Sequence, residues 1–110
     1  MAMAACDDAD GVIAGAATPS SEVIRSAIRL IGIHPNAKNV SSIFLMIAPK
    51  GDTAYTFADC AVMPEPDSKQ LAAIAGDSAA FHKLLTGEDP QVAFLSFSTK
   101  GSACHYRVDR

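Results

Sequence analysis

The feature that most constrains this fold is a pair of apolar runs joined by a tight turn. The runs span residues 40–48 and 53–62, and the short sequence PKGD, residues 49–52, lies between them. Proline and glycine in so short a link favour a reversal of the chain, and a link of that length joins antiparallel strands. The sequence therefore predicts an antiparallel hairpin at the centre of the chain.

A helical pattern precedes the hairpin. Between Glu22 and Ile31, apolar side chains recur at helical spacing and polar side chains occupy the other positions. Ser20 or Ser21 can cap this helix, because a serine oxygen accepts a hydrogen bond from an otherwise unpaired backbone N–H. Gly32 follows the last apolar position, so we expect the helix to end there.

A second helical pattern follows the hairpin, over residues 69–86. Asp67 or Ser68 is the expected cap, and Gly87 is the expected end. Gly76 lies inside the segment and weakens the helix locally, because glycine costs about 1 kcal/mol relative to alanine.

Two further apolar segments complete the expected order of elements. Residues 11–17 are small and apolar, and residues 92–98 form a run continuous enough for a strand buried on both faces. The order strand, helix, strand, strand, helix, strand predicts a mixed sheet flanked by helices, an α/β fold. A length of 110 residues fits a single α/β domain, residues 1–110.

Composition excludes several classes of protein. The net charge of -3 argues against a general nucleic-acid binder, which needs a basic face. No apolar run reaches the ~18 residues of a membrane span, and the start of the chain lacks the basic region of a secretory signal. The three cysteines form no CxxC pair and the three histidines lie far apart, so we expect free thiols, a cytoplasmic protein and no metal site.

Some glycine-containing segments approach known motifs without matching them. GVIAG lacks the spacing of GxGxxG, and TKGS has no preceding GxxxxGK. GDSAA lacks the second glycine of a nucleophile elbow. The common nucleotide-binding and hydrolase motifs are therefore absent from the sequence.

A hydroxyl-rich loop precedes the first expected helix. It contains Thr18, Ser20 and Ser21, and Arg25 follows one turn into the helix. The free N–H groups and the positive dipole end of a helix N-terminus suit an anion. The alternative is ordinary capping, with Glu22 and Arg25 forming a weak surface ion pair.

A second loop, Ser98–Ser102, combines hydroxyl groups with the ammonium of Lys100. Ligands of open α/β sheets bind beyond the carboxyl ends of strands, which favours an anion at this loop also. The alternative is a turn with a solvated lysine.

Asp59 and Cys60 interrupt the second apolar run of the hairpin. An unpaired buried charge is costly, so the carboxylate of Asp59 needs a partner. It either caps neighbouring backbone or faces a cleft, and Cys60 is expected as a small core residue.

Certain stretches of the chain are distinctive in combination: ADGVIAGAATPSSEVIR, VSSIFLM, FADCAV and VAFLSFSTKGSA. In this order and spacing they resemble the phosphate acetyltransferase (phosphotransacetylase) and phosphate butyryltransferase family, from about Ala9 onward. The resemblance implies the reversible transfer of an acetyl group between acetyl-CoA and inorganic phosphate, which gives acetyl phosphate and CoA. It also implies that the chain is an internal fragment of the catalytic region, mainly of its second domain.

The resemblance has consequences for the fold and the partners. It implies a three-layer α/β/α arrangement, part of a two-domain fold like that of isocitrate and isopropylmalate dehydrogenases. Acetyl-CoA and phosphate are the implied small-molecule substrates, with no further cofactor and no metal. The implied partners are the missing domain of the same enzyme and a second copy in a full-length homodimer, without nucleic acid or membrane.

The family carries a Ser-Arg-Gly-Cys stretch followed shortly by an aspartate, and this sequence has no match to it. The resemblance assigns to that stretch the polarisation of the thioester and the deprotonation of the CoA thiol. No residue of this chain is therefore expected to be catalytic. We expect negligible transferase activity from the chain alone, since the thiol needs a base and the oxyanion needs donors.

The resemblance places both hydroxyl-rich loops at the substrate cleft. A guanidinium is well shaped for two bonds to a phosphate, so Arg25 is the expected phosphate ligand. Thr18 stands where many members have histidine, and Ser26 stands where many have proline. The residues expected to bind phosphate or CoA are Thr18, Ser20, Ser21, Arg25, Ser98, Thr99, Lys100 and Ser102.

Other functions stay open at this point. One is a non-catalytic domain that senses acetyl-CoA, like the C-terminal part of some malic enzymes, and another is a domain that supports oligomerisation. The choice between acetyl and butyryl groups is also open, because one or two methylenes change the discrimination by only about 1–3 kcal/mol.

Overall fold

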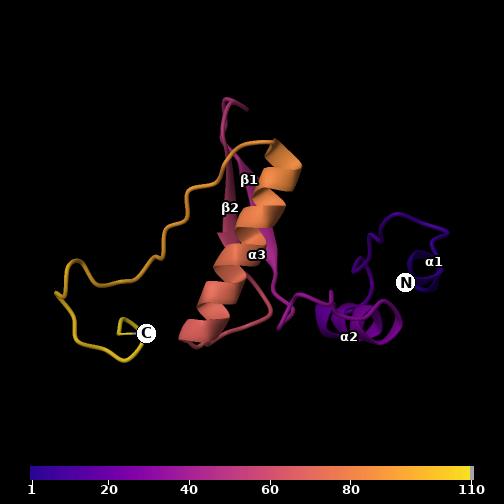
Figure 1. Cartoon of the computed structure of the whole chain (residues 1–110), viewed down its shortest axis with the longest axis horizontal. Helices are drawn as coiled ribbons and strands as arrows, with labels where there is room; N and C mark the ends of the chain where they lie inside the picture. The colour runs from indigo at the N-terminus through magenta and orange to yellow at the C-terminus, as the bar shows by residue number, and fades with distance from the viewer. Residues whose placement is uncertain (110) are drawn as a thin grey trace. The chain divides into compact units, whose positions relative to one another are not determined.

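The structure, a computed structural model, describes residues 1–109. Its elements are α1 (Ala2–Ala5), α2 (Ser20–Leu30), β1 (Ile43–Ile47), β2 (Ala54–Ala58) and α3 (Ser68–Thr86), as Figure 1 shows. The chain divides into two compact units, Met1–Lys38 and Asn39–Arg110. It is a small α/β structure with a two-stranded sheet. No helix within residues 1–109 has the length and apolar character needed to cross a membrane.

The helix α2 dominates the first unit and matches the predicted helical pattern. It has 11 residues, and Gly32 follows it with a left-handed φ of 88°, close to the predicted end. The predicted serine cap is wrong, because Pro19 occupies the N-cap and no side chain of residues 1–109 caps the helix. Proline has a fixed φ suited to a helix start, so Ser20 and Ser21 fall inside the first turn.

The strands β1 and β2 form the antiparallel hairpin that the sequence predicts. Ile43 pairs with Ala58, and the register continues without a break along both five-residue strands. Gly51 lies in the connecting turn with a φ of 71°, a conformation that glycine adopts without strain. β2 is shorter than predicted, because residues 59–62 turn around the carboxylate of Asp59.

The helix α3 packs against β2 and covers one face of the hairpin (Figure 1). Thr56 Oγ1 lies 2.9 Å from His82 Nδ1, which joins the strand to the helix. Ile74 and His82 are the buried residues of α3. The small core of the second unit therefore lies between this helix and the hairpin.

The opposite face of the hairpin is apolar and lacks a cover within the described residues. Side chains alternate along a strand, so the neighbours of Thr56 point away from α3. This outer face consists of Phe44, Met46, Tyr55 and Phe57, each about half exposed.

The ends of α3 confirm two predicted signals. Asp67 accepts a hydrogen bond from the Gln70 N–H, and Gln70 Oε1 accepts one from the Asp67 N–H, both at 2.8 Å. This reciprocal arrangement is a capping box. At the other end, Gly87 is left-handed with a φ of 77° and donates to the Lys83 carbonyl.

Replacing Asp67 with alanine is expected to lower the free energy of unfolding by about 0.5–2 kcal/mol, the usual cost of losing a helix cap. Urea unfolding followed by circular dichroism measures this loss. Asp67→Asn keeps an acceptor oxygen at the cap and is the matched control. An equal loss in both variants would contradict the capping role.

Two predicted strands, residues 11–17 and 92–98, are wrong for this structure, since both segments are irregular. Gly15 has a φ of 110°, which is outside the β region. Residues 92–98 have no neighbouring strand in the described part of the chain, and Ser96 bonds locally to the backbone of Ser98. The predicted mixed sheet is therefore replaced, over residues 1–109, by one antiparallel pair.

The expected burial of the last run is wrong as well. Phe94 is 66 % exposed and Leu95 is 84 % exposed. A strand gains its burial from the sheet around it, and this segment has no sheet partner among the residues described.

Candidate functional site

The loop before α2 leaves free donors at the helix start. The Pro19 carbonyl accepts from the N–H groups of Glu22 and Val23, at 3.0 Å and 3.3 Å. Within residues 1–109, the N–H groups of Ser20 and Ser21 have no acceptor. These two donors stand at the positive end of the helix dipole, a favourable position for an anion.

Arg25 forms the surface ion pair that the sequence left open as an alternative. Its Nη1 donates to Glu22 Oε1 at 2.9 Å, and both side chains are about half exposed. An exposed pair at this spacing contributes only about 0.2–0.5 kcal/mol, so an incoming anion can displace it.

A shallow hollow on α2 brings two of the predicted residues together. Ser21 and Arg25 line it with Ile24, Ile28 and Arg29. Arg29 lies one turn after Arg25, and the surface of the hollow is almost entirely apolar. Thr18 lies in the exposed loop before the helix and Ser20 is the first residue of the helix, and neither lines the hollow.

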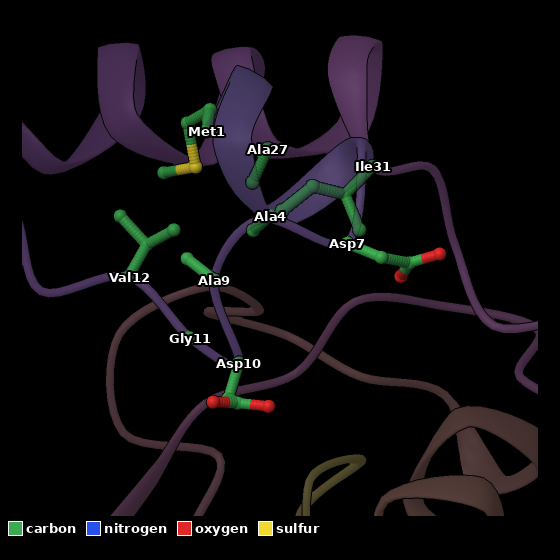
Figure 2. A pocket seen from close by; sticks show the side chains of 9 residues that line it. All are labelled: Met1, Ala4, Asp7, Ala9, Asp10, Gly11, Val12, Ala27 and Ile31. Atoms are coloured by element: carbon green, nitrogen blue, oxygen red, sulfur yellow. The ribbon is translucent and has the colours of Figure 1, made fainter.

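Another hollow of the first unit lies between the first residues of the chain and α2 (Figure 2). It contains the carboxylates of Asp7 and Asp10 and no lysine or arginine, and none of the predicted binding residues lines it. Its lining consists of Met1, Ala4, Asp7, Ala9, Asp10, Gly11, Val12, Ala27 and Ile31. Because carboxylates repel phosphate, this hollow is a poor phosphate site.

The second predicted loop is a tight turn in the second unit. The Ser102 N–H donates to the Thr99 carbonyl at 3.0 Å, and the Thr99 N–H donates to Ser102 Oγ at 2.9 Å. The central residues Lys100 and Gly101 have φ values of 47° and 78°. Positive φ at both central positions is typical of a type I′ turn.

The four predicted residues of this loop differ in exposure. Ser98 is half-buried and its hydroxyl bonds to Ala103, whereas Thr99, Lys100 and Ser102 are exposed. No acceptor for the Lys100 ammonium lies among residues 1–109. The structure thus assembles Ser98–Ser102 as one loop, and it assembles Ser21 with Arg25 separately in the first unit.

Asp59 and Ser42 form a hydrogen-bonded cluster at the open end of the hairpin. Asp59 Oδ1 accepts from Ser42 Oγ at 2.7 Å, from the Ala61 N–H at 2.8 Å and from the Val62 N–H at 2.9 Å. Its Oδ2 accepts from the Ser42 N–H at 3.2 Å. Of the two roles that the sequence left open, Asp59 therefore caps neighbouring backbone. Ser42 was missed, although the need of Asp59 for a partner was a signal for such a residue.

The environment of Asp59 changes its pKa. Partial burial acts to raise the pKa of Asp59, but the bonds from Val62, Ser42 and Ala61 outweigh it. The pKa of this carboxyl therefore lies below its ordinary value.

Acidification is expected to remove a stabilising contribution of Asp59. Because its pKa is lower in the folded state, the contribution is fully present above the ordinary aspartate pKa. It is lost as the pH falls through the lowered pKa of the folded state. Urea unfolding midpoints over a pH series measure the effect, and Asp59→Asn is expected to lack this component. Superimposable pH profiles of the two proteins would contradict the assignment.

Sequence reasoning also missed a contact between segments far apart in the chain. Tyr106 donates its hydroxyl to Glu65 Oε1 at 3.0 Å, and Arg107 pairs with the same carboxylate. Nothing in the local pattern around either segment signals this contact. The guanidinium of Arg107 is engaged by Glu65 and Tyr106, so we do not count it among the candidate phosphate ligands.

Cysteine thiols and histidine rings are the usual protein ligands of a zinc ion. Cys6 and Cys104 are exposed, and Cys60 is half-buried, with its thiol donating to the Phe57 carbonyl at 3.0 Å. Across residues 1–109, no three His, Cys, Asp or Glu side chains gather closely enough to hold a metal ion.

Comparison with known proteins gives a consistent result. The family model described as phosphate acetyl/butaryl transferase matches residues 1–110. A phosphate acetyltransferase of Thermoanaerobacterium thermosaccharolyticum is 46% identical over 106 residues, which are 93% of this chain and 32% of that protein. A phosphate acetyltransferase of Staphylococcus aureus is 50% identical over 95 residues, 86% of this chain and 28% of that protein.

A phosphate acetyltransferase of Staphylococcus epidermidis is 47% identical over 95 residues, again 86% of this chain and 28% of that protein. The chain therefore spans less than a third of the length of these relatives. The family match covers every residue of the chain, and it includes both hydroxyl-rich loops and the Asp59 cluster. The chain belongs to the phosphate acetyl/butaryl transferase family.

Proposed function

We propose that this chain is part of a phosphate acetyltransferase, an enzyme that transfers an acetyl group reversibly between acetyl-CoA and inorganic phosphate. The observation that carries the proposal is the family match over residues 1–110, with 46% and 50% identity to proteins named phosphate acetyltransferase. The role of this chain in the enzyme is to supply phosphate-binding loops. The catalytic stretch implied by the resemblance has no counterpart in its sequence.

The loop before α2 supports a role in phosphate binding. Within residues 1–109 the N–H groups of Ser20 and Ser21 are free donors, and Arg25, which lines a hollow together with Ser21, is held only by a weak ion pair. Phosphate oxygens accept several hydrogen bonds at once, and a guanidinium can supply two of them. In this proposal Arg25 binds the phosphate directly, and the hydroxyls of Thr18, Ser20 and Ser21 add donors.

The position of Lys100 supports the second loop as a phosphate ligand. Lys100 has a φ of 47°, in the left-handed region where glycine and asparagine are the usual residues. A lysine there costs roughly 1–2 kcal/mol in backbone energy. An exposed ammonium at that cost is consistent with a functional charge, and the hydroxyls of Thr99 and Ser102 lie in the same turn, which Ser98 directly precedes.

The arrangement of the whole enzyme is also part of the proposal. Residues 1–110 would form one α/β domain of a three-layer α/β/α structure, within a two-domain fold like that of isocitrate and isopropylmalate dehydrogenases. The half-exposed outer face of the hairpin supports further layers, since an apolar sheet face is normally covered. The full-length protein would be a cytoplasmic homodimer that takes acetyl-CoA and phosphate, with no further cofactor.

A titration of the isotope-labelled chain with inorganic phosphate and then with CoA tests this function. Two-dimensional amide NMR is expected to show shifts in residues 18–25 and 98–102. Sodium chloride at matched ionic strength is the control for general salt effects. Shifts confined to other residues, or no shift at millimolar phosphate, would contradict the assignment of these loops.

Replacing Glu22 with glutamine is expected to raise the affinity for phosphate about twofold. The change removes a negative charge a few ångströms from the anion and frees the Arg25 guanidinium, a gain of about 0.5 kcal/mol in water. The same amide titration measures the dissociation constant. Asp77→Asn removes an equal charge from α3 and is expected to leave the shifts of residues 18–25 unchanged. A weaker affinity in Glu22→Gln would contradict the role of Arg25.

A further inference from the structure

We infer that Ser98 is a positioning residue, and that phosphate at this loop is bound by Thr99, Lys100 and Ser102. The inference rests on the proposed function of the Ser98–Ser102 loop. It divides the loop into a residue that closes it and residues that face a ligand.

The hydroxyl of Ser98 is already committed to the fold of the loop. It accepts from the Ala103 N–H at 3.1 Å and donates to the Ala103 carbonyl at 3.4 Å. A hydroxyl has one proton, so this arrangement leaves Ser98 no proton for a phosphate oxygen. Ser98 and Ala103 are both half-buried, which fits a closing contact.

Ser96 reinforces the same end of the loop. Its hydroxyl accepts from the Ser98 N–H and donates to the Ser98 carbonyl, both at 3.2 Å. The backbone and the side chain of Ser98 are therefore all held by local bonds. Loss of the Ser98 hydroxyl would free the Ala103 N–H and widen the loop.

The rest of the loop presents donors without acceptors. Over residues 1–109, neither the Thr99 hydroxyl nor the Lys100 ammonium has a hydrogen-bond partner. The N–H groups of Lys100 and Gly101 have no partner in that part of the chain either. Ser102 Oγ accepts from the Thr99 N–H, and its own proton remains free to be donated.

These free groups match the chemistry of a phosphate. A phosphate dianion only accepts hydrogen bonds, and it gains most from donors that include a cation. The turn between Thr99 and Ser102 already fixes the backbone that carries these donors, through two reciprocal bonds. Little further ordering is therefore needed when the anion binds.

Amide NMR of the full chain, with and without inorganic phosphate, separates the two roles. Without phosphate, Ser98→Ala is expected to shift the amides of residues 99–103, most of all Ala103. Thr99→Val has nearly the same volume as the parent and is expected to disturb only adjacent amides. With phosphate, Thr99→Val is expected to weaken binding about 10-fold, in line with a lost hydrogen bond to a charged group.

Ser98→Thr, unlike Ser98→Ala, keeps a hydroxyl that can close the loop. It is therefore expected to show the Ala103 amide position and the phosphate affinity of the parent chain. A Ser98→Thr variant that has the parent position of the Ala103 amide but binds phosphate more weakly than the parent would overturn the positioning role. An unmoved Ala103 amide in Ser98→Ala would overturn it independently of any ligand. A parent loop that phosphate does not shift, with Ala103 moved in Ser98→Ala, would overturn the proposed role of this loop in phosphate binding and leave Ser98 as the closing residue of an ordinary turn.

Discussion

Replacing Asp59 with alanine is expected to lower the free energy of unfolding by about 2–4 kcal/mol. The carboxylate accepts from the hydroxyl and the N–H of Ser42 and from the N–H groups of Ala61 and Val62. Hydrogen bonds to a charged group contribute about 1.5–3 kcal/mol each when dry, and partial exposure of this cluster reduces the total. Four such bonds meet at one side chain, so its removal frees donors on both sides of the hairpin end.

Chemical denaturation with urea measures this loss in the free energy of unfolding, and two further variants serve as comparisons. Asp59→Asn keeps one acceptor oxygen without the charge and is expected to lose less than Asp59→Ala. Asp52→Ala removes an exposed aspartate near the hairpin turn, whose side chain bonds, among residues 1–109, only to Thr53. Comparable small losses in Asp59→Ala and Asp52→Ala would show that the cluster contributes little to stability.

The Ser42 hydroxyl provides an independent check on the same cluster. It donates to Asp59 and accepts from the N–H groups of Cys60 and Ala61, at 3.2 Å and 2.8 Å. Because the two side chains share partners, their effects are not expected to add. A double variant less destabilised than the sum of Asp59→Ala and Ser42→Ala would identify the pair as one cooperative unit.

Local signals in the sequence predicted the elements that depend on local physics. The PKGD turn forces the reversal between β1 and β2, and Asp67 with Gln70 starts α3 by bonds within one turn. Gly87 ends α3 because it adopts the left-handed conformation without strain. Each of these features involves residues a few positions apart, so the sequence alone contains the information.

Elements that need a distant partner were predicted less well. Residues 11–17 and 92–98 have the composition of strands, but a strand forms only when another strand supplies its hydrogen bonds. The partner of Asp59 lies 17 positions away at Ser42, and the local pattern indicated a need for a partner without its identity. The serine cap of α2 failed for a different reason, because Pro19 competes for the same position.

The candidate site shows the same difference between features that the local sequence indicates and features that only the structure reveals. Arg25 and the Ser98–Ser102 loop were predicted as phosphate ligands from residue types and from the resemblance, and the structure gives their local geometry. The commitment of the Ser98 hydroxyl to Ala103 was not visible in the sequence, because a serine in a loop can face either the backbone or a ligand.

The 110-residue chain is expected to form acetyl phosphate at least about 10³-fold more slowly than the full-length phosphate acetyltransferase of Staphylococcus aureus. The catalytic stretch that the resemblance implies, with its serine, arginine and aspartate, has no match in the chain. Loss of one oxyanion donor typically costs about 10²–10³-fold, and loss of a general base costs about 10²–10⁴-fold. These factors do not multiply when the groups act as one unit, and about 10³-fold lies within both ranges.

A direct assay of acetyl phosphate formation from acetyl-CoA and phosphate measures this difference. The S. aureus enzyme, assayed under the same conditions, is the positive control. Turnover of the chain within tenfold of that enzyme would contradict the prediction and would require a catalytic group among the residues of this chain.

Binding and catalysis are expected to separate in this chain, and that separation has a physical reason. Loops that bind phosphate equally well in the ground state and in the transition state lower KM, but they do not raise kcat. Acceleration requires groups that stabilise charge as it develops on the thioester oxygen and remove the proton of the thiol. In the proposed function, the donors of Ser20, Ser21, Arg25 and Lys100 would provide the first kind of interaction only. A chain that shifts its loop amides with phosphate and yet produces no acetyl phosphate would therefore be the combined result that this division of labour predicts.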